Sequence, residues 1–194
     1  MAKKLKELVQ AVDSHVKYSI GTSNKFIENF AFDLCLPFFV GVFAANRIPH
    51  RELNGRERFI VIVNLGEKKS RTPSMGRSRA EPPVGHFVVV CAERERIQYW
   101  DPYALPCLQP KVLDFLRRSG RRDMETNRTQ IQDFKSVYCG FYCLLYAGYQ
   151  ARCMVGKPPR FKLRFYKSVQ KLKKNDEKCM LYLRKLVDHV DKLE

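Results

Sequence analysis

The chain has 194 residues, of which 45% are hydrophobic and 12% aromatic, and its formal net charge is +16 at pH 7. This length fits one compact domain over residues 1–194 and is too short for two good hydrophobic cores. The longest apolar run, residues 34–45, is broken by Pro37 and Gly41, so no membrane-spanning helix is expected. The N-terminus lacks the apolar core of a signal peptide, so we expect an intracellular protein.

The excess of basic residues is the strongest feature of the composition. It typically indicates a polyanionic partner, usually nucleic acid held through its phosphates, and a solvated basic surface is the alternative. The sequence has no helix-turn-helix or zinc-finger signature, so we expect DNA to be bound without sequence preference. The residues expected to contact it are Lys68, Lys69, Arg71, Arg77, Arg79, Arg117, Arg118, Arg121, Arg122, Lys171, Lys173 and Lys174.

Seven cysteines form an odd and irregularly spaced set, which indicates reduced thiols rather than a disulfide framework. They lack the paired spacing of a zinc site. We therefore expect neither a metal nor an organic cofactor, and we expect a monomer.

Several elements can be predicted in chain order. Residues 3–12 carry a helical apolar stripe, whereas residues 26–43 mix apolar segments and receive no assignment. Residues 59–64 are β-branched and predict a buried strand. Residues 66–83 are basic and rich in Ser, Pro and Gly, which predicts an exposed loop.

Residues 85–103 predict an antiparallel hairpin, because two apolar strands flank a charged turn. A turn centred between Glu93 and Arg94 would pair Val90 with Ile97 and Val88 with Tyr99. The same register places His86 opposite Asp101, with their Cβ atoms about 5 Å apart. The alternative is a surface His–Asp neighbour without a role.

The remaining elements are three helices and a strand. Residues 112–118 carry a helical stripe that ends at Gly120, and residues 128–132 predict a short strand. Residues 137–149 are apolar on all sides, which is typical of a buried central helix. Residues 171–193 predict a final amphipathic helix.

The start of the central helix carries a candidate nucleophile. Ser136 is the expected N-cap, which makes Cys139 the third helical residue, among backbone N–H groups without intrahelical partners. The positive end of the helix dipole favours thiolate over thiol, and Gly140 permits close approach of another segment. The alternative is that Cys139 is a small core residue, as most free cysteines are.

A cysteine, a histidine and an acid that orients the histidine can together form a catalytic triad. The imidazole of His86 takes the thiol proton of Cys139, and Asp101 fixes the imidazole tautomer. The thiolate then attacks a carbonyl, and the developing oxyanion needs a hydrogen-bond donor. Gln132 can supply a side-chain N–H together with the backbone amide of Cys139. Gln130 lies within reach on the same side, so spacing alone leaves the choice open.

The sequence resembles the adenovirus-type (adenain-like) cysteine proteases and the related proteases of large virus-like DNA transposons, within the clan of ubiquitin-like-protein proteases. The resemblance is carried by His86 and the apolar run after it, by Trp100-Asp-Pro-Tyr103, and by the series Asn127, Gln132, Ser136, Cys139-Gly140. Residues 41–49, 59–64 and 175–183 also resemble segments of that family. The likeness therefore covers most of the chain.

The resemblance implies an α+β fold in which a small mixed β-sheet packs against a buried helix bearing the nucleophile, flanked by N- and C-terminal helices. It also implies roles for four residues. His86 would be the general base, Asp101 the orienting acid, Cys139 the nucleophile and Gln132 the oxyanion donor, the last by the family's seven-residue spacing.

The implied function is a cysteine endopeptidase that cleaves viral precursor proteins near small residues, often glycine, during virion maturation in the host nucleus and the virion. The family also implies stimulation by DNA and by a viral peptide activator. Adenovirus enzymes bond that peptide through a cysteine shortly before the glutamine, and residues 120–127 contain none. A disulfide-linked activator is therefore not expected. The alternatives are a deubiquitinating or deSUMOylating isopeptidase and a non-enzymatic, basic DNA-packaging protein.

Overall fold

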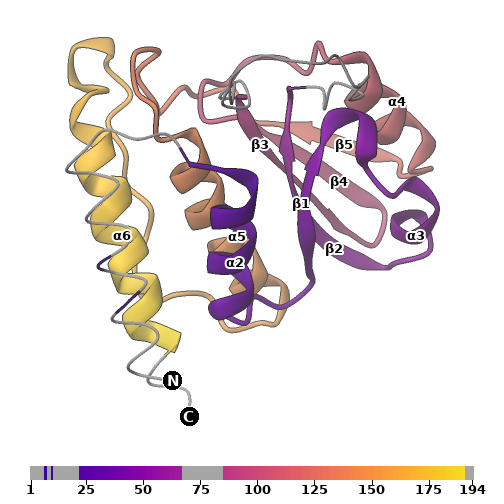
Figure 1. Ribbon diagram of the computed structural model, residues 1–194, viewed down its shortest axis with the longest axis horizontal. Coiled ribbons are helices and arrows are strands. Elements are labelled where there is room, and N and C mark those ends of the chain that lie inside the picture. Colours follow the sequence, from indigo (N-terminus) through magenta and orange to yellow (C-terminus); the bar gives the residue numbers. More distant parts are fainter. Residues whose placement is uncertain (1–6, 8–9, 11–21, 67–84, 191–194) are drawn as a thin grey trace, which may run out of the picture.

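The structure is a computed structural model that describes residues 7, 10, 22–66 and 85–190. The strands of this part form one five-stranded mixed sheet in the order β1-β2-β3-β4-β5 (Figure 1). Parallel pairs, β1 with β2 and β4 with β5, flank two antiparallel pairs in the middle. The strands are β1 Phe39–Ala44, β2 Arg58–Asn64, β3 Phe87–Glu93, β4 Arg96–Trp100 and β5 Asp123–Thr126. The expected α+β class with a small mixed sheet is confirmed.

Helices cover both faces of this sheet (Figure 1). Helices α2 and α5 lie on one face, and α6 packs on the outer side of α5. Helices α3 and α4 and a 3₁₀ turn, η1, lie on the other face. The helical bounds are α2 Asn24–Asp33, η1 Ala45–Arg47, α3 His50–Asn54, α4 Pro110–Arg118, α5 Cys139–Met154, η2 Val169–Lys171 and α6 Lys174–Val190.

The central strands β2 and β3 are buried on both faces of the sheet, which explains why their sequences are continuously apolar. In β3, Val89 packs into the core shared with α5, whereas its neighbours Val88 and Val90 pack into the core shared with α4. Period-two alternation therefore puts apolar side chains into both cores, so no polar face remains. The strand predicted over residues 59–64 is confirmed as β2, of which Phe59–Val63 are fully buried.

Helix α5 is buried on nearly all sides, as its sequence predicts, but it begins differently from the expectation. Its N-cap is Tyr138, and Cys139 is therefore the first helical residue and not the third. The Ser136 hydroxyl is the reason, because it accepts from the amide of Tyr138 at 3.3 Å and donates to Asp176 at 2.9 Å. It stabilises the turn before the helix and does not cap the helix itself.

The hairpin register also differs from the prediction, by two residues. Val90 faces Tyr99 and Ala92 faces Ile97, so His86 is not directly opposite Asp101. Strand β3 stays extended to Glu93 because it pairs with β2 there, and the amide of Arg94 donates to Glu57 O at 2.9 Å. The turn therefore moves to residues 94 and 95. A two-residue shift preserves the faces, so the predicted side of the sheet is right.

Other predictions have mixed outcomes. The helix over 112–118 is confirmed as part of α4, and the final helix is confirmed from Lys174. The predicted strand over 128–132 is wrong, because the amides of Ile131 and Gln132 both donate to the carbonyl of Pro102 and form no ladder. The strand is instead β5. The loop predicted over 66–83 lies outside the described residues from residue 67, as does the helix over 3–12 except for residues 7 and 10.

Candidate active site

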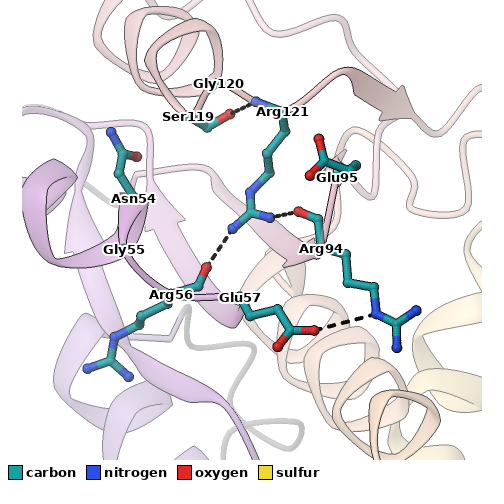
Figure 2. A pocket seen from close by; sticks show the side chains of 9 residues that line it. All are labelled: Asn54, Gly55, Arg56, Glu57, Arg94, Glu95, Ser119, Gly120 and Arg121. Atoms are coloured by element: carbon teal, nitrogen blue, oxygen red, sulfur yellow. Dashed lines mark hydrogen bonds and ion pairs between the residues drawn. The ribbon is translucent and has the colours of Figure 1, made fainter.

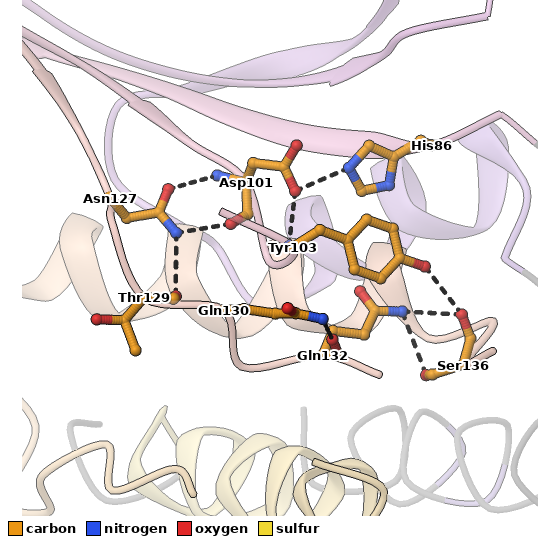
Figure 3. Close-up of polar contacts among 8 residues, drawn as sticks. All are labelled: His86, Asp101, Tyr103, Asn127, Thr129, Gln130, Gln132 and Ser136. Carbon is orange, nitrogen blue, oxygen red and sulfur yellow. Dashed lines mark hydrogen bonds and ion pairs between the residues drawn. The ribbon is translucent and has the colours of Figure 1, made fainter. Parts of the chain in front are cut away.

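His86 and Asp101 meet where strands β3 and β4 end. His86 directly precedes β3, Asp101 directly follows β4, and His86 Nε2 lies 2.9 Å from Asp101 Oδ1 (Figure 3). Asp101 is fully buried, and its Oδ1 also accepts from the amide of Tyr103 at 2.7 Å. A carboxylate oxygen only accepts hydrogen bonds, so Nε2 carries the hydrogen. The other ring nitrogen, Nδ1, is thereby left as the acceptor in the neutral imidazole.

The backbone of Asp101 is fixed by Asn127. The Oδ1 of Asn127 accepts from the Asp101 amide at 2.8 Å, and its Nδ2 donates to the Asp101 carbonyl at 2.6 Å (Figure 3). Both backbone groups of Asp101 are therefore satisfied by one side chain, although Asp101 lies just past the end of its strand. These two hydrogen bonds fix the backbone of Asp101 and thereby help to position its carboxylate next to His86.

Cys139 acts on the same imidazole. Burial lowers the pKa of His86, but hydrogen bonding and charge from Asp101 and Cys139 outweigh it and raise the pKa from 6.5 to about 9. The His86 Nδ1 is buried and makes no well-formed hydrogen bond among the described residues. Cys139 therefore influences the ring without a well-formed hydrogen bond to Nδ1. Such loose geometry is common in a substrate-free site.

The first turn of α5 fixes the position of Cys139, which is only 6% exposed. As the first helical residue, Cys139 has a backbone N–H without an acceptor inside the helix. Gly140 follows because nothing larger fits: a Cβ there would lie 1.9 Å from Thr22 Oγ1 and 2.6 Å from Ile27 Cδ1. The segment that approaches closely at Gly140 is therefore part of this chain and includes Thr22 and Ile27.

Gln132 is fully buried beside the turn that leads to Cys139, and its side-chain nitrogen has two acceptors there. Its Nε2 donates to the Ser136 carbonyl at 3.0 Å and to the Ser136 hydroxyl at 3.2 Å (Figure 3). Its Oε1 is buried without a partner among the described residues. Gln130 has a different place, because its side chain donates to the backbone carbonyl of Gln132 at 2.7 Å.

Tyr103 also lies at the site, although it is not among the catalytic residues predicted from the sequence. Its ring stacks on His86, with centroids 4.6 Å apart and planes 23° apart, and its hydroxyl donates to Ser136 O at 3.1 Å. It therefore contacts both the His86–Asp101 pair and the turn that leads to Cys139 (Figure 3). The available sequence signal is its place in Trp-Asp-Pro-Tyr, two residues after Asp101.

Residues at the start of α6 form hydrogen bonds with the turn that leads to Cys139. Asp176 accepts from Ser136 Oγ and from the hydroxyl of Tyr142 on α5, both at 2.9 Å. Asn175 is fully buried, and its Nδ2 donates to the carbonyls of Ile131 and Tyr166. Burial raises the pKa of Asp176, against the hydrogen bonds from Tyr142 and Ser136. The C-terminal helix is thus tied to the segment that carries Gln132 and Ser136.

The basic residues expected to bind DNA fall into three groups. Lys68, Lys69, Arg71, Arg77 and Arg79 lie outside the described residues. Near the end of α4, Arg118 pairs with Asp114 at 2.8 Å and Arg122 with Glu95 at 3.9 Å. Arg121 donates to the carbonyls of Arg94 and Arg56 (Figure 2). Around η2, by contrast, Lys171, Lys173 and Lys174 have no ion pair within the described part of the chain, and Arg117 likewise has none.

Two cavities lie near these groups. One, of about 620 Å³, lies at the end of α4, and its lining does not include His86, Asp101 or Cys139 (Figure 2). The second, of about 460 Å³, lies closer to the site, because Trp100 and Asn127 line it. Its other lining residues are Arg128, Thr129, Ile131, Tyr146, Leu163, Arg164, Phe165 and Lys167.

The structure adds three general findings. All seven cysteines are free thiols. Among the described residues, no cluster of His, Cys, Asp and Glu side chains is placed to hold a metal ion. No helix within the same residues has the length and apolar character needed to cross a membrane.

Comparisons with known proteins leave the family open. No family model matches the sequence, and no curated protein matches it. The solved structure "AvrA delL154 with IP6, CoA" is similar with a TM-score of 0.44 and 18% identity, over 78% of this chain and 61% of that one. The central domain of the uncharacterized Lpg1148 protein from Legionella pneumophila has a TM-score of 0.43 and 13% identity, over 86% and 98% of the two chains. Neither likeness identifies the family of this chain.

Proposed function

We propose that the protein is a cysteine endopeptidase in which Cys139 is the nucleophile, His86 the general base and Asp101 the acid that orients it. One observation carries the proposal. His86 Nε2 is held 2.9 Å from the buried Asp101 carboxylate, while Nδ1 is left free on a ring whose pKa Cys139 helps to raise. A neutral imidazole in this tautomer can take the proton of the thiol, and the raised pKa keeps that proton on the ring as an imidazolium beside the thiolate.

The chemistry runs in two halves. The Cys139 thiol gives its proton to His86 Nδ1, and the thiolate adds to the substrate carbonyl to form a tetrahedral oxyanion. When this collapses, the C–N bond breaks, the imidazolium protonates the leaving amine, and a thioester remains on Cys139. His86 then takes a proton from water, which adds to the thioester carbonyl; the C–S bond breaks, the carboxylic acid product leaves, and the imidazolium returns the proton to the Cys139 sulfur. Asp101 keeps its negative charge throughout and stabilises the imidazolium.

The oxyanion would be held by the backbone N–H of Cys139 and by the side-chain amide of Gln132. Loss of one such donor typically slows a reaction about a hundredfold. In the substrate-free structure Gln132 donates to Ser136 instead. The proposed role therefore requires its amide to turn when substrate binds.

The substrate class rests on the sequence resemblance to the adenovirus-type proteases. It suggests viral precursor proteins cleaved beside small residues, with DNA held on the basic surface and a noncovalent peptide activator or none. An isopeptidase acting on ubiquitin-like proteins would use the same catalytic group. Cleavage of ubiquitin-type fluorogenic substrates, with precursor peptides left intact, would favour that isopeptidase.

Covalent labelling tests the catalytic group directly. The protein is treated with a peptide vinyl sulfone ending in glycine, and its intact mass is measured beside Cys139→Ala, His86→Ala and the control Cys153→Ala, which removes an exposed thiol. We expect one label in the wild type and in the control, and none in Cys139→Ala or His86→Ala. Slow, equal labelling of several cysteines in all four proteins would contradict the proposal and would leave the basic DNA-packaging protein as the better interpretation.

A further inference from the structure

The carbonyl of Ser136 receives two side-chain donors at once. Tyr103 Oη donates to it at 3.1 Å and Gln132 Nε2 at 3.0 Å, and the same Nε2 also donates to Ser136 Oγ at 3.2 Å (Figure 3). The Gln132 Oε1 remains buried without a partner in the described part of the chain. Gln132 is therefore incompletely satisfied where it rests, whereas the Ser136 carbonyl has one donor for each of its lone pairs.

Turning the Gln132 amide toward an oxyanion would withdraw both of its bonds from Ser136. The hydroxyl of Ser136 would keep two other partners, since it donates to Asp176 and accepts from the amide of Tyr138. The carbonyl of Ser136 would keep only Tyr103. Without that phenol, the departure of Gln132 would leave this part-buried carbonyl unpaired, and an unpaired buried acceptor is unfavourable.

Tyr103 is well placed to remain on Ser136 while Gln132 moves. Its ring stacks on His86, its backbone amide donates to Asp101 Oδ1, and Phe134 packs on its ring with centroids 5.1 Å apart. Burial raises the pKa of Tyr103 further above its usual value, so its hydroxyl stays protonated and able to donate.

We propose that Tyr103 is a positioning residue that keeps the Ser136 carbonyl hydrogen-bonded when Gln132 turns its amide to the oxyanion, and so lets Gln132 act as a donor. This inference rests on the proposed thiol chemistry. It assigns to the phenol a role in acyl transfer alone, because formation of the thiolate involves His86 and Asp101 and does not require Gln132 to move.

Two reactions of Cys139 should respond differently to the loss of the Tyr103 hydroxyl. Acylation by an ester passes through an oxyanion, whereas alkylation by iodoacetamide does not. Tyr103→Phe removes the hydroxyl and retains the ring that stacks on His86. We expect it to slow acylation about tenfold to a hundredfold, the effect of one unpaired buried acceptor, and to leave the rate and the pH profile of alkylation unchanged.

The test uses the p-nitrophenyl ester of N-acetylglycine, with release of p-nitrophenolate as the acylation signal, and iodoacetamide labelling followed by mass. The variants are Tyr103→Phe, Gln132→Ala and their double variant. Tyr182→Phe on α6 is the control, because it also removes a hydroxyl that contacts backbone, at Arg164. We expect the Tyr103→Phe effect to disappear in the Gln132→Ala background, since the phenol acts through Gln132.

Slower acylation with normal alkylation, and coupling to Gln132, would support the inference. Equal acylation by Tyr103→Phe and wild type, with a Cys139-dependent signal in both, would overturn it and leave the proposed enzyme standing. Additive losses in the double variant, or an altered alkylation pH profile, would assign Tyr103 to His86 instead and would also overturn it. Absence of Cys139-dependent acylation in the wild type would overturn the proposed function, and this inference with it.

Discussion

At the scale of single residues, His86 connects the site to the stability of the fold. Its pKa is about 9 in the folded protein and 6.5 as the ordinary value. Below pH 6.5 the imidazole is protonated in both states, so its stabilisation of the fold is fully present. Between pH 6.5 and 9 the unfolded chain has already released the proton that the folded chain still holds. The stabilisation therefore declines as pH rises through this window and is gone above it.

The difference in unfolding free energy between the wild type and His86→Gln should follow that course. We expect the wild-type advantage to be larger at pH 6 than at pH 9.5, by up to about 3 kcal/mol. Urea unfolding at both pH values measures it, and comparison with His86→Gln cancels the titration of other groups. A difference that grew with pH would show that burial, and not the partners of His86, controls its pKa.

The partners themselves can be ranked by NMR titration of His86. Asp101 is the larger of the influences that raise its pKa, and Cys139 the smaller. We expect Asp101→Asn to lower the His86 pKa more than Cys139→Ala does, because the neutral amide of an asparagine would offer the ring no negative charge. The reverse order would mean that Cys139 acts on the ring more strongly than Asp101 does, and no change in Cys139→Ala would mean that the thiol does not act on it.

The candidate site residues could be selected from the sequence more readily than the contacts around them. His86, Asp101 and Cys139 could be selected because their side chains form a known catalytic logic. Tyr103 and Ser136 are joined to the site by contacts in which one partner is a backbone group, such as the Tyr103 amide on Asp101 and the Ser136 carbonyl under the Tyr103 hydroxyl. Any residue type has a backbone amide and carbonyl, so no residue pattern indicates such contacts.

At the scale of elements, the packing of α6 on α5 holds the turn that leads to Cys139. Gly148 of α5 permits this approach, because a Cβ there would lie 2.3 Å from Leu186 Cδ2. Leu183 is buried in the same core, whereas Leu181 on α6 is 48% exposed. The two leucines offer one substitution in two environments of a single helix.

We expect Leu183→Ala to lower the free energy of unfolding by about 2–5 kcal/mol, through reduced burial and a cavity. Leu181→Ala should change it by less than about 1 kcal/mol, since leucine and alanine have similar helix propensities and little buried area is removed. Urea unfolding of both variants at neutral pH decides this. Similar losses of stability in the two would mean that α6 is not packed on α5 as described.

Elements with strong apolar patterns were the predictable ones. Helix α5 and strand β2 bury apolar residues on every side, and this is visible in their composition. Strand β5 is exposed along its whole length and exists because β4 offers it a parallel partner. The position of the hairpin turn likewise depends on where the pairing of β3 with β2 ends, and this pairing joins residues that are distant in the sequence. Neither can be inferred from local pattern.

At the scale of the whole molecule, the positive charge is unevenly available. Three arginines of the β3–β4 turn and the α4 end pair with carboxylates: Arg94 with Glu57, Arg118 with Asp114 and Arg122 with Glu95. The lysines around η2 lack such partners among the described residues, although Lys171 lies 5.7 Å from the centre of the Tyr166 ring. A phosphate could reach these lysines without breaking an ion pair.

If the protein binds DNA, the two groups should contribute differently to its salt dependence. Each lysine that contacts a phosphate adds about 0.9 to the slope of log K against log salt on duplex DNA. We expect Lys171→Gln, Lys173→Gln and Lys174→Gln together to reduce the slope by about one unit for each phosphate that is no longer bound. Arg94→Gln, Arg118→Gln and Arg122→Gln together remove the same net charge but should leave the slope nearly unchanged, since each of these arginines already pairs with a carboxylate.

Fluorescence anisotropy with one duplex over a range of salt concentrations measures both slopes. The equal charge of the two triple variants matters, because it separates local phosphate contact from the general attraction of a +16 chain. Equal reductions in both would mean that net charge alone attracts the polyanion. A flat salt dependence in the wild type would show that the basic surface holds no phosphates, and the charge would then serve only to keep the molecule solvated.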